Sequence, residues 1–566
     1  MSAFQSFRGQ ALRLTFRASS RLSVAVIAAS CVCALTAPAA NSQALTPGNL
    51  VVSRSVYTDT NSVKVGDILP PNCASTTGGC SPGTGAIAGS NFPFVFNNDV
   101  YDASFGITSK ILLDQITVTG TPVSTLEVPN STDTGVTPTS DQLVTSFSSK
   151  SEMALHLSTN REYLSFMGYH APVGAVDVSN SNTPGAVDPT NPVGQNFYRG
   201  TGIVSAAGKF FFTLTNAYSG NNGRSAVLNS AAGVFYTAGN AGNGSNPQPT
   251  GVVLGAGTQF IRLKTSPEST QTVQAPTPVG SFSVTELGDK SDKIGKDDNF
   301  RGLALYNNVL YYTKGSGSNG VNTVYFLDTT GTACPKGVGL PVPGAALPTA
   351  PLSVNAATLE TKGLSSNMCI LAGFPTALAK SASPVAFPFG LWFANPTTLY
   401  VADEGDGSTS GDFYTHAAAQ TTAGLQKWIF NSEAGEWQLA YVLQTGLALG
   451  TPYTVSGYPT GTNSATGLNW SPATDGLRNI TGLVGDGTYP ELPVGKVAIF
   501  GISSTVSGGG DQGADPNKLF VVIDELANTT PSVAAKESFA TIKYAKYGEV
   551  LRGVAFTPGS TNITSY

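Results

Sequence analysis

Short apolar runs separated by polar turns make up nearly the whole chain. The runs are rich in Val, Ile, Tyr, Phe and Thr, and clusters of Gly, Asn, Pro and Ser separate them, which is typical of strands joined by turns. No segment of about 12 or more residues sustains apolar positions at i, i+3 and i+4. The pattern therefore predicts an all-β protein.

One motif returns at intervals of about 70 to 90 residues. Phe300–Leu305 leads through a polar turn into Val309–Tyr312, and Leu551–Phe556 repeats the first run almost letter for letter. Similarity at a fixed period, built from strands, is the signature of a β-propeller or another repeat array. Such a repeat describes a scaffold, whereas function depends on sites placed on that scaffold.

Grouping the runs in fours predicts five consecutive blades. The first two hold 153–157, 163–169, 197–204 and 209–214, then 225–228, 234–238, 251–254 and 259–263. The third starts at Arg301 and includes Thr323–Leu327. The last two hold 391–394, 399–402, 425–430 and 437–443, then a run near Arg478 with 497–502, 519–523 and 539–544.

A sixth blade follows from the strands that remain at the two ends. The run 552–556 would pair with 49–56, 111–118 and 122–128, and this closure would remove the exposed edges of an open ring. We therefore predict a single propeller of six four-stranded blades. Seven blades is the alternative, because the units between 300 and 480 are long enough to contain another.

The first 44 residues have the pattern of a signal peptide. Arg8, Arg13, Arg17 and Arg21 precede an apolar run at 22–35, and Ser42-Gln43-Ala44 resembles a cleavage site. The run is too short for a permanent membrane helix, and no later stretch reaches about 18 residues. We expect residues 1–44 to be removed, and residues 45–566 to form a secreted or periplasmic propeller domain with long loop insertions.

Removal of that segment changes the formal charge from −5 to −9, because 26 basic residues then face 35 acidic ones. A mildly acidic chain without basic clusters argues against nucleic acid or an anionic membrane as partner. Charged residues make up 11% of the chain, against ~25% in typical soluble domains. The expected partner is an extracellular ligand, a glycan or a protein, with no integral membrane segment after cleavage.

Four cysteines lie beyond the signal region. Cys73 and Cys80 enclose a short Gly/Ser/Thr-rich loop, and Cys334 and Cys369 bracket a Pro/Ala-rich excursion. Zinc would need paired short spacings or histidine partners, which are missing. We therefore expect two local disulfides, Cys73–Cys80 and Cys334–Cys369, in an oxidising compartment.

Several segments together resemble a group of exported bacterial β-propeller proteins that mostly carry no assigned function. The segments that carry this resemblance are 48–52, 218–227, 399–405, 424–428 and 551–558. They are spread over nearly the whole mature chain, so the resemblance implies the propeller fold. It implies no catalytic motif. The long inserts around Cys73–Cys80 and Cys334–Cys369 look like elaborations on that pattern.

Four stretches are long for loops of a compact domain, and they are the expected place for specificity. They are Tyr57–Pro93, Val173–Pro192, Thr329–Pro388 and Thr445–Asp475.

Candidate ligand-binding residues recur in phase with the repeat. Arg224, Arg301, Arg478 and Arg552 each begin a predicted innermost strand, and guanidiniums near one channel mouth could grip a carboxylate or phosphate. The alternative is that each arginine ties its blade to a neighbour, which the phasing favours. His156 alternates with Ala154 on a predicted inner strand and could face the channel, although a packed structural histidine is the simpler interpretation.

A metal site is the second candidate. Asp403, Glu404 and Asp406 lie on a Gly-rich loop after a predicted strand, and oxygen ligands on a tight loop suit calcium, the one cofactor that the pattern suggests. The spacing does not fit an EF-hand. An acidic, solvated turn is the alternative interpretation.

Signatures of catalysis are sparse. Only His156, His170 and His416 could act as imidazole bases, and none lies beside a recognisable nucleophile motif. The favoured hypothesis is thus a secreted binding or interaction module of unknown ligand. The alternative is an extracellular hydrolase or lactonase-like enzyme with its site at the channel mouth.

Overall fold

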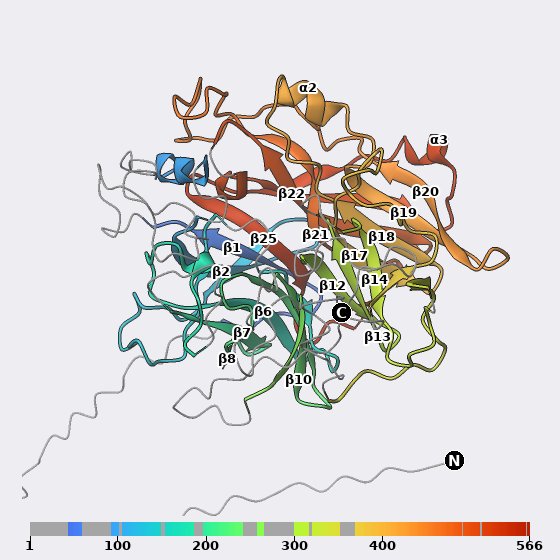
Figure 1. Ribbon diagram of the computed structural model, residues 1–566, viewed down its shortest axis with the longest axis horizontal. Helices are drawn as coiled ribbons and strands as arrows, with labels where there is room; N and C mark the ends of the chain where they lie inside the picture. The colour runs from blue at the N-terminus through green and yellow to red at the C-terminus, as the bar shows by residue number, and fades with distance from the viewer. Residues whose placement is uncertain are drawn as a thin grey trace, which may run out of the picture. The chain divides into compact units, whose positions relative to one another are not determined.

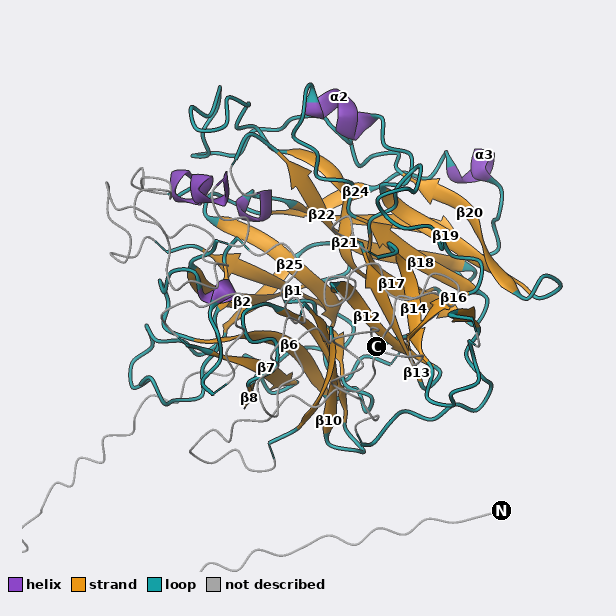
Figure 2. Ribbon diagram, viewed as in Figure 1, coloured by secondary structure: helices purple, strands orange, loops and turns teal. Residues whose placement is uncertain are grey.

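The computed structural model describes most of the chain after the first 42 residues. The described residues are 43–58, 92–100, 105–148, 153–185, 196–240, 257–264, 299–315, 320–334, 336–350, 368–489, 491–509, 512–561 and 563–566. Strands dominate this part of the chain, and the helices are short (Figure 2). They are η1 (Phe94–Val100), η2 (Val178–Asn180), α2 (Phe413–Ala418), η3 (Gln512–Ala514) and α3 (Pro531–Ala534).

Six antiparallel sheets form a ring, which is a six-bladed β-propeller (Figure 1). The prediction of six blades is confirmed, and the seven-blade alternative is wrong. One blade joins the two ends of the chain, since β25 (Glu549–Phe556) pairs with β1 (Leu50–Val56). Its other strands are β2 (Thr108–Ile116), β3 (Pro122–Glu127) and β4 (Thr145–Ser146).

The other five blades follow in chain order. The first two are β5 (His156–Leu157), β6 (Tyr163–His170), β7 (Tyr198–Ser205) and β8 (Phe210–Thr215), then β9 (Gly223–Asn229), β10 (Val234–Gly239) and β11 (Thr258–Arg262). The third holds β12 (Phe300–Tyr306), β13 (Val309–Lys314), β14 (Thr323–Leu327), β15 (Val338–Gly339) and β16 (Met368–Leu371). The last two are β17 (Pro388–Asn395), β18 (Thr398–Asp403), β19 (Gly424–Asn431) and β20 (Glu436–Leu443), then β21 (Ala473–Val484), β22 (Lys496–Val506), β23 (Lys518–Glu525) and β24 (Ala540–Tyr544).

Three blades depart from the predicted grouping. In the closing blade, β4 pairs with β2 as a fifth strand that was not expected. The run 259–263 was expected as a fourth strand, but β11 pairs directly with β10 and is the third. The expected strand 251–254 lies outside the described residues. In the third blade, β15 adds to β16 in parallel, so that this sheet has five strands.

The arginine repeat marks a β-bulge in the innermost strand of four blades. Pairing with the second strand shifts register at Arg224, between Phe300 and Leu303, between Leu477 and Ile480, and beside Arg552. A bulge bends its strand and re-aims one side chain. The arginines therefore mark a bend that recurs in four blades, and β17 shifts register between Pro388 and Leu391 without an arginine.

The glycine after the arginine lets neighbouring blades come close together. A Cβ on Gly302 would overlap the carbonyl oxygen of Phe389 in the next blade, and a Cβ on Gly553 would overlap that of Met153. A hydroxyl spans each contact: Ser53 Oγ accepts from the N–H of Gly553 at 2.8 Å and donates to Met153 O at 2.8 Å. Thr313 makes the same bridge from Gly302 to Phe389.

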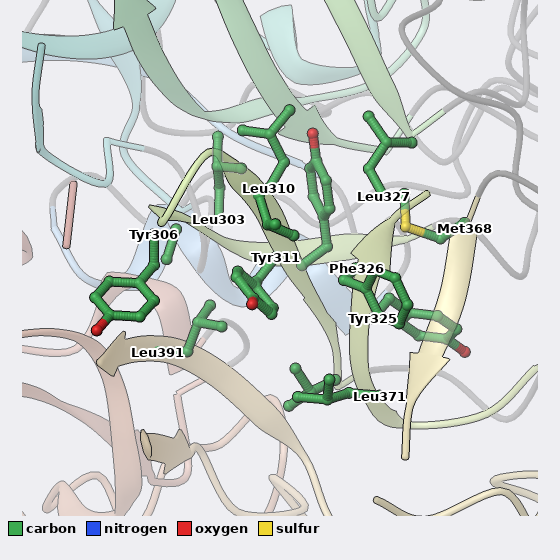
Figure 3. Packing of buried hydrophobic residues seen from close by; sticks show 14 of the residues in the cluster. Leu303, Tyr306, Leu310, Tyr311, Tyr325, Phe326, Leu327, Met368, Leu371 and Leu391 are labelled. Atoms are coloured by element: carbon green, nitrogen blue, oxygen red, sulfur yellow. The ribbon is translucent and has the colours of Figure 1, made fainter. Parts of the chain in front are cut away.

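Aromatic side chains fill the space between blades. Tyr306 on β12 stacks on Phe393 of β17 with ring centroids 4.6 Å apart. Figure 3 shows Tyr306, Tyr311 and Leu391 from these two blades packed in one cluster. Burial of such rings stabilises the contact between neighbouring blades.

The β12–β13 hairpin illustrates how sequence sets local geometry. Asn307 and Asn308 both have positive φ, of 46° and 60°. Two central residues with positive φ define a type I′ turn, whose twist matches paired strands, and asparagine tolerates that conformation.

A disulfide joins Cys334 to Cys369, 35 residues apart, and this prediction is confirmed. The expected Cys73–Cys80 bond lies outside the described residues. Among the helices of the described residues, none combines the length and the apolar character needed to cross a membrane.

Candidate functional site

The predicted arginines contact protein groups, mostly of adjacent segments. Arg224 Nη1 donates to Phe300 O, 2.7 Å away on the next blade, and Arg478 Nε donates to Glu404 Oε2 at 3.0 Å. Arg552 donates to Ser55 Oγ at 2.9 Å and to the carbonyl of Phe147. The contacts of Arg224 and Arg478 match the blade-tying alternative. Ser55 and Phe147, which Arg552 contacts, lie on β1 and directly after β4 of its own blade. The ligand-binding role of the arginines stays a prediction.

Arg301 lies near the charged groups of Glu404 and Arg478. Its guanidinium carbon is 5.9 Å from the ring centroid of Phe389. Burial lowers the pKa of Arg301, the charge of Glu404 opposes this, and Arg478 adds to it. Arg301, Arg478 and Glu404 therefore form one electrostatic cluster, in which the single carboxylate already pairs with Arg478.

His156 lies in a confined space, and its role in ligand binding stays a prediction. It lines a cavity of only about 30 Å³ together with Trp392, Thr481 and Tyr566. Burial lowers the pKa of His156 to about 4. The cavity has room for one or two water molecules beside the neutral imidazole, and a larger ligand does not fit.

The segment after β25 contributes Ile563, Ser565 and Tyr566 to the wall of the His156 cavity. Leu305 exchanges two backbone hydrogen bonds with Tyr566, at 2.8 and 3.0 Å. Arg161 donates to Ile563 O at 3.0 Å, and its guanidinium carbon lies 5.6 Å from the ring centroid of Tyr566. These contacts hold the C-terminal segment against the His156 cavity.

The predicted metal residues do not converge. Asp403 accepts the N–H groups of Phe387 and Gly405 at 2.9 and 3.0 Å, while Glu404 pairs with Arg478. Asp406 instead pairs with His416, with Oδ2 and Nε2 2.5 Å apart. Gly405, with φ +79°, turns the loop so that the three carboxylates diverge.

Two carboxyl groups beside this loop have strongly raised pKa values. Burial raises the pKa of Asp403 to about 6, although the N–H groups that it accepts oppose the rise. Burial also raises the pKa of Asp475 to about 7; the Gly407 N–H opposes this, and the charge of Asp406 adds to it. Asp475 accepts from Gly407 N at 2.9 Å and Gln420 Nε2 at 2.5 Å. Both side chains are buried and hold the loop.

One side-chain group in the described part of the chain brings potential ligand atoms within 4.8 Å of one another, and it consists of Asp328, Cys334 and Cys369. Its two sulfurs form the disulfide and are not thiolates. The calcium prediction for Asp403, Glu404 and Asp406 therefore gains no support from their geometry.

A cavity of about 620 Å³ lies on the β5–β8 blade and is here called the Phe197 cavity. Its described lining contains no charged side chain. The lining residues are Ser131, Val136, Thr137, Pro138, Thr139, Gln142, His170, Ala171, Pro172, Pro184, Asn196, Phe197, Tyr198 and Leu214.

The loop between β3 and β4 forms one wall of the Phe197 cavity. The end of this loop packs on Gly168 and Gly200, which pair directly on β6 and β7. Gly200 leaves space for the Leu143 side chain, and Gly168 leaves space for the carbonyl oxygen of Val144. Within the loop, Gln142 Nε2 donates to Thr137 O at 2.8 Å, and Ser140 N donates to the same carbonyl at 3.0 Å. These bonds hold the wall in place.

The opposite wall consists of strand ends. His170 ends β6 and pairs with Tyr198, which begins β7. His170 Nε2 lies 3.1 Å from Ser140 O, which joins the strand end to the loop. Burial lowers the pKa of His170, while the Ser140 carbonyl and the charge of Asp141 oppose the shift. The imidazole is therefore neutral at neutral pH.

Sequence reasoning found one part of this cavity and missed the rest. Pro184 belongs to the long loop 173–192, where specificity was expected. The contribution of residues 131–142 depends on a contact between two blades, for which the sequence carries no local signal.

Comparison with known proteins leaves the function open. No protein-family model matches the chain, and no curated protein matches it. Two solved structures of an ulvan lyase, from a polysaccharide lyase family, align over most of the chain. The form bound to a glucuronic acid and sulfated rhamnose oligosaccharide covers 88% of this chain and 96% of its own, with 10% identity and a TM-score of 0.28. The other covers 87% and 95%, with the same identity and TM-score. At that similarity they carry no argument about this protein.

Proposed function

We propose that this protein is a secreted β-propeller binding module and that its ligand binds in the Phe197 cavity. One observation carries the proposal: a cavity of about 620 Å³, with no charged side chain among the described residues that line it, lies between a hydrogen-bonded loop and the end of β6. Ligand sites commonly have volumes of about 300 to 1,000 Å³, with apolar walls and a few polar groups.

The walls favour a neutral ligand. Phe197, Tyr198 and three prolines contribute rings or apolar surface, and the described lining offers no counter-ion. A charged ligand would lose hydration without compensation. The internal hydrogen bonds of the loop reduce the ordering cost of binding, because the wall is in place beforehand.

The hydrolase alternative rests on the raised pKa values of Asp403 and Asp475, which are typical of acid–base residues. Both carboxylates are buried, however, and accept hydrogen bonds from the loop that they hold. Neither lines the Phe197 cavity. Binding is therefore the function that the geometry favours.

The test is a thermal-shift screen of the purified protein with neutral sugar fragments and neutral ring compounds, each beside a carboxylate-bearing analogue. A ligand that binds only the folded state stabilises it by a free energy of about RT ln(1 + [L]/Kd), and the melting temperature rises as a result. We expect shifts from neutral compounds only. Shifts from charged analogues alone would contradict the proposal.

A further inference from the structure

The orientation of His170 defines one hydrogen-bonding position in the Phe197 cavity. Its Nε2 lies 3.1 Å from the carbonyl oxygen of Ser140. A carbonyl oxygen only accepts, so Nε2 carries the proton and donates. In a neutral imidazole the other nitrogen, Nδ1, is then an acceptor.

Nδ1 has no hydrogen-bond partner among the described residues. His170 lines the cavity, and its Nε2 edge is occupied by Ser140. A ligand in the cavity can therefore form a hydrogen bond with Nδ1, and Nδ1 accepts that bond.

We infer that the ligand of the Phe197 cavity is an uncharged ring compound that carries a hydroxyl group, and that this hydroxyl donates to Nδ1 of His170. The inference rests on the binding function proposed above and adds the chemistry of the ligand. The ring packs against Phe197 and Tyr198, while the hydroxyl selects among rings of similar shape. Sites built to bond a hydroxyl discriminate strongly against analogues that lack it.

The charged groups around His170 are consistent with a neutral imidazole, in which Nδ1 remains an acceptor. Asp141 is the acidic group next to Ser140, and Lys264 Nζ lies 3.6 Å from its carboxylate. On the paired strand, the guanidinium of Arg199 lies over the Tyr169 ring, 5.2 Å from its centroid. None of these groups forms an ion pair with His170 in the described part of the chain, so burial keeps the ring neutral.

The experiment compares two probes of nearly equal shape, 2-naphthol and 2-methoxynaphthalene, by titration calorimetry with the full protein. One hydrogen bond to a neutral partner corresponds to about tenfold in affinity. We expect 2-naphthol to bind about tenfold more tightly at neutral pH. The preference should vanish in His170→Phe and should decline in acid, where protonated Nδ1 can no longer accept.

The outcomes separate the two proposals. Equal affinity of both probes, unaffected by His170→Phe, would overturn the hydroxyl inference and leave the binding function standing. If neither probe binds, the proposal that the Phe197 cavity binds an uncharged ligand is overturned as well. If His170→Phe fails to fold, loss of the preference in acid with the native protein supports the inference, and a preference unchanged in acid contradicts it.

Discussion

His170 and Ser140 join two blades, because Nε2 at the end of β6 donates to a carbonyl of the β3–β4 loop at 3.1 Å. This bond fixes the imidazole tautomer and at the same time holds the loop over the blade. One contact thus both shapes the Phe197 cavity and leaves an acceptor on its wall.

Gly302 should tolerate no side chain. In Gly302→Ala the new Cβ would overlap the Phe389 carbonyl of the next blade, and such overpacking costs up to about 3 kcal/mol. Gly233→Ala is the control, since its Cβ meets open space and only the φ of +62° costs about 1 kcal/mol. Urea unfolding measures both, and equal losses would contradict this role of the repeat.

The hydroxyl of Thr313 should matter for the same contact. Thr313→Val removes the acceptor for Gly302 N–H and the donor to Phe389 O, which leaves two buried backbone groups unpaired at about 1 to 3 kcal/mol each. Thr119→Val, on an exposed hairpin, should change the free energy of unfolding by less than about 0.5 kcal/mol.

Stability should fall as the pH rises from about 4 to about 7. Burial raises the pKa of Asp403 from 3.8 to about 6, and that of Asp475 from 3.8 to about 7. The folded state then holds more protons than the unfolded state. The stabilisation is complete below the unfolded pKa and is lost as the pH rises through the folded pKa, by up to about 1.4 kcal/mol per pH unit for each group.

Asp475→Asn isolates this effect. The amide cannot titrate, so the variant should show a flatter pH dependence of the free energy of unfolding than the native protein. Chemical denaturation across the acid range measures the difference. A slope unchanged by the substitution would show that Asp475 ionises normally in the folded protein.

The strands could be predicted from the sequence because alternation and turn residues act locally. The asparagine pair at 307–308 forms the hairpin turn between two strands, and the arginine repeat coincides with the β-bulges. β11 was misplaced because its neighbour in the sheet is decided by pairing, and a run of apolar residues does not reveal its partner.

The candidate sites were harder to predict, because they depend on where side chains point and on contacts between residues that are far apart in the sequence. Asp403, Glu404 and Asp406 are close in sequence, yet Gly405 turns them toward different donors. His170 carried no motif, and its importance comes from Ser140, which belongs to another blade.

The most direct test of the cavity is to block it. Thr139 lines the Phe197 cavity and is exposed, so Thr139→Trp should occlude the cavity at little cost to the fold. Thr121→Trp places the same side chain on the exposed β2–β3 turn as the matched control. We predict that neutral ligands from the screen, measured by calorimetry, lose at least about tenfold in affinity for Thr139→Trp and bind the control normally. Unchanged affinity for Thr139→Trp, with both variants melting like the native protein, would place the ligand elsewhere and contradict the account.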